Sequence, residues 1–287
     1  MAKDKKKSLH GEEAFEEYYS AIYGQRWPAL KAALLKESQP KAFKAFDGGP
    51  EYFLDSASVL AALSLPLKNA QKILDMCAAP GGKSLVLARR MNGGASLRCN
   101  ERSFDRFQRL RKVVAEHLPQ DTQERVKISC GDGALLCKKE SVLYDAILLD
   151  APCSSERHVL NDPKYLAEWS PARVKSLAMQ QWALLSSAYR LLAPGGFLLY
   201  STCAINQSEN SQLAQRLLKK FPEARAVSLE EVSAFQEAGK KEILDFFDVT
   251  ALPKFEAQEL GFSILPDVQD GAGPIYFCLF EKTMDKI

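Results

Sequence analysis

The stretch LDMCAAPGGKSLVLARR, residues 74–90, joins an apolar run to an amphipathic segment through a turn of small residues. A glycine-rich turn between a strand and a helix presents backbone N–H groups and the positive end of the helix to a ligand. The stretch therefore predicts a strand, a ligand-binding turn and a helix, in that order.

Two familiar kinds of ligand turn do not fit these residues. A phosphate loop of the form G-x-x-x-x-G-K-[ST] needs glycine five residues before Gly82, where this chain has Cys77. The G-x-G-x-x-G turn of dinucleotide-binding proteins is also absent. A methyl-donor site remains, because its nucleoside needs an open turn of small residues and no cradle for a pyrophosphate. A tight turn without a ligand is the alternative.

From residue 71 onward, short apolar runs alternate with amphipathic stretches. Helices are expected over 83–91, 103–117 and 171–193, and Pro194-Gly195-Gly196 is expected to end the last one in a turn. This alternation predicts an α/β fold with a doubly wound, mostly parallel sheet. The strands are apolar throughout, as expected when helices cover both faces. The predicted strands are KILDMCA (72–78), ASLRCNE (95–101), RVKISCGD (125–132), YDAILLDAP (144–152) and GFLLYSTC (196–203).

The two ends of the chain differ from this central pattern. Residues 261–282 indicate a final antiparallel hairpin, and residues 11 to about 46 have near-helical spacing of apolar side chains. FDGGPEYF at 46–53 indicates a turn-rich joint. The predicted organisation is a small N-terminal helical appendage over 1–70 and a catalytic domain over 71–287.

Acidic residues follow several of the predicted strands. Glu101 ends the second strand about 20 residues after the glycine turn, where a nucleotide-binding sheet places a carboxylate on ribose hydroxyls. Asp132 ends the third strand, where it can meet an adenine amino group. Asp75 and Asp150 also lie at or near strand ends, and open parallel sheets bind ligands at that edge. The four acids favour a ligand that carries a nucleoside.

Composition excludes several classes of protein. The 287 residues carry a net charge of +2, and no apolar run reaches the roughly 20 residues of a membrane helix. Seven cysteines without a CxxC pair, and only three histidines, argue against a metal site. The basic start, MAKDKKKSLH, has no apolar segment after it and indicates a solvated tail or a phosphate contact rather than a secretion signal. A cytoplasmic monomer with free thiols is expected.

Three separated motifs, DMCAAPGGKS (75–84), DAPCSSERH (150–158) and YSTCAINQSEN (200–210), occur in order. They resemble the motifs of the Sun/Fmu (NOL/NOP/Sun) family of S-adenosylmethionine-dependent RNA cytosine-C5 methyltransferases. FEEYYSAIYGQRWPALKAALL (15–35) and GPIYFC (273–278) are similar to the compact, organellar-type branch of that family. The resemblance implies a Rossmann-like class I methyltransferase fold and RNA as the partner, with rRNA favoured and tRNA next.

The resemblance also implies roles for individual residues. Cys203 would be the nucleophile, and Cys153 would help to release the product. Many members have a glycine-containing stretch after the first cysteine, where this chain has Ser154-Ser155-Glu156-Arg157-His158, and this departure leaves the substrate open. The residues implied to surround the methyl donor, S-adenosyl-L-methionine, are Cys77, Ala78, Ala79, Pro80, Gly81, Gly82, Lys83, Glu101, Asp132 and Asp150.

The chemistry explains why two strand ends would each carry a sulfur. Carbon 5 of cytosine is a poor nucleophile until a thiolate adds at carbon 6, which is covalent catalysis. Lys83 is the nearest cation that can favour the thiolate, although a solvated lysine is the alternative, and Asp150 can share a proton near N3. If the strands ending at Asp150 and Tyr200 are neighbours, Cys153 and Cys203 emerge side by side.

Contacts to RNA are less well defined by the sequence. The arginines of RSFDRFQRLRK (102–112) indicate either the solvated face of a helix or a phosphate contact. Tyr18, Tyr19 and Trp27 can stack on unpaired bases or pack the appendage onto the core. NDPKYLAEWSPARVKSL (161–177) indicates a mobile or plain surface loop beside the site. Two other functions stay open: a non-catalytic RNA-binding or ribosome-assembly factor, and a methyltransferase acting on DNA or protein.

Overall fold

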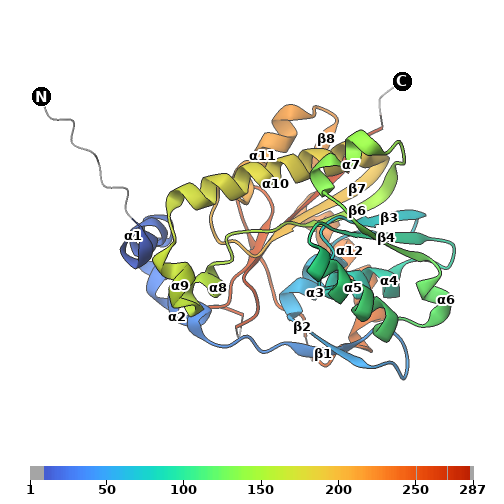
Figure 1. The fold of residues 1–287 in the computed structure, drawn as a ribbon, viewed down its shortest axis with the longest axis horizontal. Coiled ribbons are helices and arrows are strands. Elements are labelled where there is room, and N and C mark those ends of the chain that lie inside the picture. The colour runs from blue at the N-terminus through green and yellow to red at the C-terminus, as the bar shows by residue number, and fades with distance from the viewer. Residues whose placement is uncertain (1–9, 250, 270, 285–287) are drawn as a thin grey trace, which may run out of the picture.

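The computed structural model describes residues 10–249, 251–269 and 271–284 (Figure 1). The basic start of the chain, with the exception of His10, lies outside the described residues, and so does its suggested contact with phosphate.

A nine-stranded sheet runs through the centre of the molecule (Figure 1). Its order is β5-β4-β3-β6-β7-β11-β10-β9, with β8 paired to β11. The first five strands are parallel, whereas β11 runs antiparallel to β7 and pairs with β10 in the expected hairpin. The strands are β3 (Lys72–Asp75), β4 (Ser96–Glu101), β5 (Val126–Cys130), β6 (Tyr144–Asp150), β7 (Leu192–Thr202), β8 (Ala224–Ala226), β9 (Glu256–Ala257), β10 (Phe262–Ile264) and β11 (Ile275–Lys282). The predicted mostly parallel sheet with an antiparallel C-terminal strand is confirmed.

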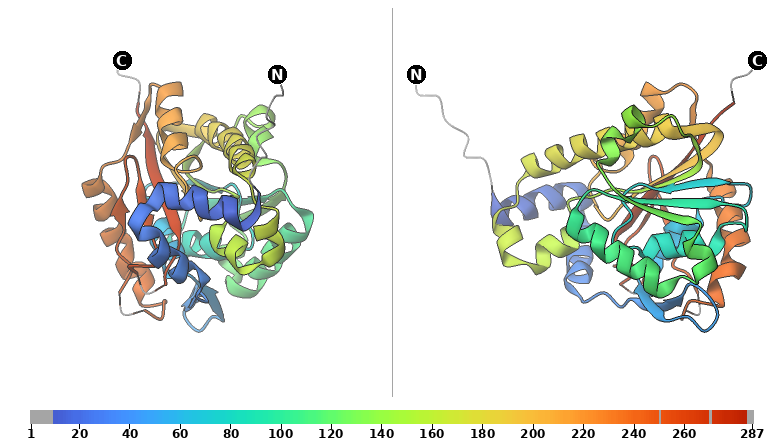
Figure 2. Two further views of the ribbon diagram at one scale, coloured as in Figure 1. Left: turned by 90° about the vertical axis from the view of Figure 1, so that its left-hand side faces the viewer. Right: turned by 45° about the vertical axis from the view of Figure 1, so that its right-hand side comes forward.

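Helices cover both faces of the sheet, as Figures 1 and 2 show. One face carries α3 (Ser56–Leu63), α4 (Gly82–Arg90), α5 (Phe104–His117) and α12 (Leu229–Leu244); the other carries α7 (Gly133–Lys139), α10 (Pro171–Leu191) and α11 (Ser211–Lys220). A short helix, α6 (Gln120–Gln123), precedes β5. In β6, Ala146 and Leu148 belong to one core while Ile147 and Leu149 belong to the other. Because successive side chains of a strand point to opposite faces, a strand covered on both faces is apolar throughout.

The end of α10 differs from the prediction. The helix ends at Leu191, and Pro194-Gly195-Gly196 lies inside β7 rather than in a turn. The pairing of β7 with β6 shifts register between Tyr144 and Ala146, so the strand absorbs the irregular segment as a bulge. Gly195 has φ +75°, and a Cβ at Gly196 would lie 2.9 Å from two carbonyl oxygens. The glycines therefore allow a close approach of two strands.

The N-terminal segment contains more than helices. The expected helices are α1 (Gly11–Tyr23) and α2 (Trp27–Leu35), with a 3-10 turn, η1 (Gly24–Arg26), between them. The predicted helix does not extend to residue 46, because β1 (Lys41–Lys44) and β2 (Glu51–Leu54) form an antiparallel hairpin around the turn-rich joint. Helix α3 was not predicted: six of its eight residues are buried, so it lacks an amphipathic period.

A third apolar cluster holds the N-terminal helices against the loop that follows β6. Phe15, Tyr19 and Trp27 pack with Trp169 in this cluster, and the aromatic rings are in contact. The loop expected over 161–177 forms α8 (Glu156–Asn161), α9 (Pro163–Ala167) and the start of α10. The segment is helical and Trp169 is fully buried, so the expectation of a loop here is wrong. In Figure 2, α1 and α2 lie beside α8 and α9 in both views.

Replacing Gly196 by alanine should destabilise the protein. The new Cβ would lie 2.9 Å from the carbonyl oxygens of Ala193 and Asp145, which are backbone atoms and cannot rotate away. Overpacking of this kind costs about 1–3 kcal/mol of the free energy of unfolding, measured by urea denaturation. Gly93→Ala is the matched control, since no atom lies within 4 Å of its Cβ position. Equal stability of the two variants would contradict the close packing described for β7.

Candidate active site

The glycine-rich turn between β3 and α4 is held by contacts on three sides. Ala78 N donates to Asn100 O at 2.8 Å, which ties the turn to the end of β4. Gly81 has φ +124°, and a Cβ there would lie 2.8 Å from Val113 of α5. A Cβ at Gly82 would lie 2.3 Å from the side chain of Leu54 in β2. Close packing therefore favours glycine at both positions, and at Gly81 the positive φ favours it as well.

A cavity of about 210 Å³ opens beside this turn at the carboxyl ends of β3, β4 and β5. Its walls include Cys77, Glu101 and Asp132, together with apolar groups from Met76 and Leu184. Glu101 Oε1 accepts from Ser103 N at 2.9 Å, whereas buried Oε2 has no hydrogen bond in the described structure and lies 3.7 Å from the Arg106 guanidinium. A buried acceptor without a donor on a cavity wall fits a ligand hydroxyl.

The donor-site residues expected from the sequence lie in three places. Cys77, Glu101 and Asp132 line this cavity, and Lys83 and Asp150 line a second, larger one. Ala78, Ala79, Pro80, Gly81 and Gly82 line neither cavity and form the turn between them. Burial holds the pKa of the Cys77 thiol well above its usual range, so this sulfur is neutral.

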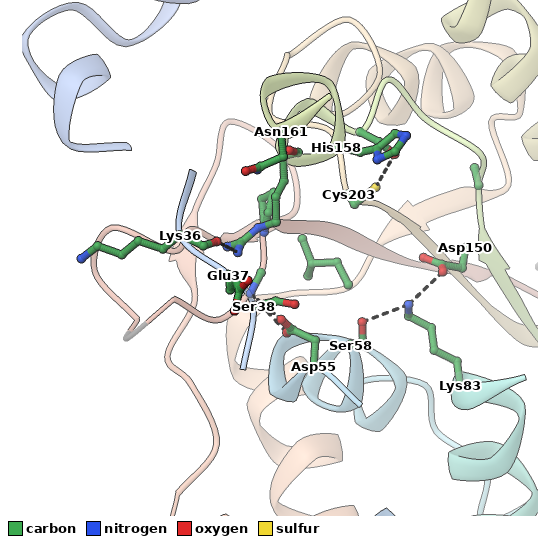
Figure 3. A pocket seen from close by; sticks show the side chains of 16 residues that line it. Lys36, Glu37, Ser38, Asp55, Ser58, Lys83, Asp150, His158, Asn161 and Cys203 are labelled. Carbon is green, nitrogen blue, oxygen red and sulfur yellow. Dashed lines mark hydrogen bonds and ion pairs between the residues drawn. The ribbon is translucent and has the colours of Figure 1, made fainter. Parts of the chain in front are cut away.

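The second cavity is a cleft of about 780 Å³ (Figure 3). Lys83 Nζ lies 2.8 Å from Asp150 Oδ2 and 3.2 Å from Ser58 Oγ at its base. Ser201 Oγ donates to the other Asp150 oxygen at 2.7 Å. Burial by itself would lower the pKa of Lys83, but the charge and hydrogen bond of Asp150, with a contribution from Cys203, raise it above its usual value. Lys83 is therefore an ammonium ion at neutral pH.

The two sulfurs meet at the rim of the same cleft. Asp150 of β6 pairs with Ser201 of β7, and Cys153 and Cys203 follow within three residues. Both cysteines are free, and their Sγ atoms lie 2.6 Å apart. The expected side-by-side placement is confirmed. Cys203 lines the cleft and Cys153 does not.

The environment of Cys153 keeps it protonated. Its hydrogen bond to Cys203, followed by burial, holds the pKa of the Cys153 thiol well above its usual range. A neutral thiol can donate to a neighbouring thiolate but is a poor nucleophile. The pair is therefore unequal, with Cys203 as the sulfur that faces the cleft.

Two buried carboxyl groups support the loops that carry the cysteines. Glu209 Oε2 accepts from Ser154 N at 3.0 Å and from Gln181 Nε2 at 2.6 Å. Glu156 Oε2 accepts from Ile205 N at 3.1 Å, and Asn206 Nδ2 donates to both carboxyl groups. Burial, reinforced by the charge of Glu209, raises the pKa of Glu156 above its usual value. These contacts fasten the loop after β6 to the loop after β7.

Helix α1 reaches the same network through two tyrosines. The hydroxyl of Tyr19 donates to Glu156, and Tyr23 Oη donates to Ile205 O at 2.6 Å. Tyr19 and Trp27 are buried, and Arg26 pairs with Glu256 and Asp267. These side chains pack against other parts of the protein instead of being exposed for stacking on a nucleic acid.

Helix α5 exposes most of its basic residues. Leu110 and Val114 are buried, while Phe107 is only half-buried. Arg106 donates to Ala79 O at 2.5 Å and therefore supports the glycine turn. For the other arginines of α5, the two predicted alternatives, a solvated helix face and a phosphate contact, both stay open.

Several residues of the site were not predicted from the sequence. Helix α10 contributes Gln180, Ala183 and Leu184 to the smaller cavity, far along the chain from the glycine turn. Tyr19, Glu156 and Glu209 act through contacts across more than 50 residues. Glu156 lies inside the second quoted motif, Glu209 inside the third and Tyr19 inside the quoted stretch 15–35, and these positions were the available clues.

None of the helices in the described part of the chain has both the length and the apolar composition of a membrane-spanning helix. No group of three or more His, Cys, Asp or Glu side chains in the same residues is arranged to hold a metal ion.

The sheet order, with antiparallel β11 beside β7, and a cavity at the carboxyl edge define a Rossmann-like fold of the methyltransferase type. The family model described as 16S rRNA methyltransferase RsmB/F matches residues 62–264, and the chain belongs to this family. The family membership expected from the three motifs is therefore confirmed.

Named relatives agree with this family. The chain is 32% identical to the 5-cytosine rRNA methyltransferase NSUN4 of Mus musculus over 239 residues, which are 80% of this chain and 60% of that protein. It is 37% identical to the ribosomal RNA small subunit methyltransferase F of an Escherichia coli strain over 175 residues, 60% of this chain and 36% of that protein. The chain thus spans well under two thirds of the length of these relatives.

Solved structures share the fold. A methyltransferase homolog protein from Pyrococcus horikoshii superimposes with a TM-score of 0.68 at 20% identity, covering 93% of this chain and 94% of the other. NSun6 from the same organism gives a TM-score of 0.62 at 21% identity, covering 84% of this chain and 56% of that one. At these identities the likeness concerns the fold alone.

Asp75 should make stability depend on pH. Burial, opposed by the Ser84 hydrogen bond at 2.7 Å, raises the pKa of Asp75 from 3.8 to about 7. Between these values the folded protein holds a proton that the unfolded chain has released. The contribution of Asp75 to the free energy of unfolding therefore falls as pH rises through this window, by at most about 1.4 kcal/mol per pH unit.

Asp75→Asn keeps an acceptor for Ser84 and removes this titration. Its stability relative to the wild type should rise from pH 4 to pH 7 in urea denaturation. Asp121→Asn, a change at an exposed residue, should leave the pH dependence unaltered. Parallel profiles for wild type and Asp75→Asn would show that Asp75 does not hold the proton.

Proposed function

We propose that this protein transfers a methyl group from S-adenosyl-L-methionine to carbon 5 of a cytosine in RNA, through a transient bond between Cys203 and carbon 6. The observation that carries the proposal is the placement of Cys203. Its sulfur faces the cleft, touches Cys153 and shares the cleft with the Lys83–Asp150 pair. Membership in the RsmB/F family and the names of the relatives support the same reaction.

The smaller cavity is the proposed site of the methyl donor. Glu101 would accept from the ribose hydroxyls, since its buried Oε2 lacks a hydrogen-bond donor, and Asp132 would meet the adenine. Met76 and Leu184 would flank the adenine ring. When bound, S-adenosyl-L-methionine supplies an electrophilic methyl group.

The residues of the larger cleft would activate the base. The Cys203 thiolate adds to carbon 6, which makes carbon 5 electron-rich. Lys83, held as an ammonium ion by Asp150, stabilises the thiolate before addition and the negative charge that develops on the ring afterwards. Both Asp150 oxygens accept hydrogen bonds, one from Lys83 and one from Ser201. In this arrangement Lys83, bound to Asp150, would provide the proton that is shared with N3 of the cytosine ring.

Product release requires two further events. The proton on carbon 5 leaves, and the electron pair of that C–H bond restores the ring double bond as the Cys203–carbon 6 bond breaks. Cys153 lies against Cys203 and is proposed to assist the elimination by passing its thiol proton to the departing Cys203 sulfur. The Cys153 thiolate formed in this way would then take the proton from carbon 5. Its contact with the leaving sulfur supports this role.

We propose structured rRNA as the first substrate and tRNA as the next. The support is the description of the family and the names of the relatives. A base must leave its stack to enter a cleft of this depth, and an unpaired cytosine leaves at least cost. RNA processing by this chain in a reducing, cytoplasmic setting agrees with the free cysteines.

The segment 1–70 is proposed as the part of the chain that faces the RNA beside the catalytic domain over 71–287. Lys36 and Ser38 line the cleft and support this placement. We also propose that the protein acts as a monomer.

Cys203→Ala should abolish turnover and spare donor binding. The expected loss of methyl incorporation into RNA is at least about a thousandfold, because no other thiol faces the cleft. Calorimetry should give unchanged affinity for S-adenosyl-L-methionine, since Cys203 does not line the donor cavity. Bisulfite mapping of RNA from cells with and without the gene identifies the base. Methylation that survives this substitution would refute the covalent route.

Cys153→Ala should trap the protein on RNA. If Cys153 helps to break the Cys203–carbon 6 bond, the variant accumulates a protein–RNA adduct that resists denaturation and migrates slowly in a gel. The double variant Cys153→Ala, Cys203→Ala is the control and should form no adduct. Normal turnover by the single variant would remove Cys153 from the release step.

A further inference from the structure

Ser155 has a backbone conformation that residues other than glycine rarely adopt. Its φ is 54° and its ψ 60°, and it is the one non-glycine residue with positive φ in the described part of the chain. Left-handed geometry is unfavourable for a residue with a Cβ, and such strain persists where surrounding contacts enforce it. It is often found at functional sites.

The surrounding contacts hold Ser155 from both sides. Ser154 N is bound to Glu209, and the carboxyl group of Glu156 accepts from Ile205 N. The carbonyl of Ser155 accepts from Val159 N at 3.0 Å. The residue is therefore fixed by its neighbours, and its side chain is directed by the fold rather than by its own preference.

The Ser155 hydroxyl contacts both sulfurs. Oγ is 3.1 Å from Cys203 Sγ and 3.5 Å from Cys153 Sγ, and the residue lines the cleft. The distance of 3.1 Å is within hydrogen-bonding range for sulfur.

We propose that Ser155 is a further catalytic residue, whose hydroxyl donates a hydrogen bond to the Cys203 thiolate and holds that sulfur facing the cleft. The proposal rests on the proposed role of Cys203 as nucleophile. A thiolate is only an acceptor, and a serine hydroxyl keeps its proton throughout the pH range of the enzyme, so the direction of donation is defined.

Other groups act on the same sulfur and differ from Ser155 in kind. Cys153 is a titratable donor, Lys83 contributes charge, and Asp150 and His158 line the same cleft. Arg157, also in the cleft, donates to the carbonyls of Lys36 and Gly271. Cys153 and Ser155 both contact the Cys203 sulfur, and of these two donors Ser155 is the one that does not titrate.

The test measures alkylation of Cys203 by iodoacetamide as a function of pH, with the modified peptide quantified by mass spectrometry. The full chain is used as wild type, Ser155→Ala and Ser155→Gly. Both variants lack the hydroxyl, so the pH of half-maximal rate should rise by about one unit in each. The rate at high pH should not fall, because a thiolate without a hydrogen bond is at least as nucleophilic.

The two substitutions separate the hydroxyl from the backbone. Glycine relieves the left-handed strain, so Ser155→Gly should unfold at a temperature no lower than that of the wild type. Ser38→Ala, in the same cleft and without a contact to either sulfur in the described structure, should leave the alkylation midpoint unchanged. An unchanged midpoint in both Ser155 variants would overturn the proposal, and so would a shift in the alanine variant alone.

This measurement needs neither RNA nor methyl donor. If the alkylation midpoint shifts as expected but the protein methylates no RNA, the role of Ser155 toward Cys203 is supported and the proposed function is rejected. In the opposite case, methylation that depends on Cys203 together with unshifted midpoints would retain the function and reject Ser155.

Discussion

The parallel pairing of β6 with β7 is the constraint on which the site depends. Five consecutive residues of each strand are in register, from Ala146 with Phe197 to Asp150 with Ser201, and Ala151 N continues the ladder to Ser201 O at 2.8 Å. Adjacent strands lie about 4.8 Å apart, so the two loops that follow must begin side by side. A slip of one residue would turn the apolar side chains of a strand to the opposite face. Because both faces are packed against helices, the register is strongly defined.

Burial of charge behind this ladder gives the site its electrostatic character. Lys83 and Asp150 form a pair at the base of the cleft, and Glu156 and Glu209 lie deeper, each with several hydrogen-bond donors. Buried polar groups that make all their hydrogen bonds hold the surrounding loops rigidly. If one partner is lost, the other stays buried without a hydrogen bond, which lowers the free energy of unfolding by its desolvation penalty. The cysteine loops are therefore positioned by a polar network, and Cys203 lines the cleft beside it.

The N-terminal helices belong to the same construction. Their aromatic cluster packs on Trp169, and the hydroxyls of Tyr19 and Tyr23 end on Glu156 and on the carbonyl of Ile205. A segment that precedes the sheet in the chain thus supports both cysteine loops at once. A movement of α1 against the sheet would shift Glu156 and the backbone at Ile205 through these two hydrogen bonds. The N-terminal segment is therefore coupled to the chemistry proposed for the cleft.

The sequence by itself determined what local pattern encodes. Continuous apolar runs placed the parallel strands, the glycine turn located the start of α4, and motif spacing placed Cys153, Cys203, Glu101 and Asp132 at the carboxyl ends of strands. Local pattern failed where burial removed the helical period, as in α3, and where Gly195 and Gly196 serve strand packing instead of a turn.

Only the tertiary structure decided which residues meet across long separations. Three features join distant parts of the chain. They are the wall of the smaller cavity formed by α10, the hydrogen bond from Tyr19 to Glu156, and the contact of Ser155 with Cys203. Such contacts follow from how helices and loops pack on the sheet. No window of sequence holds both partners, so their physical cause lies in the folded arrangement.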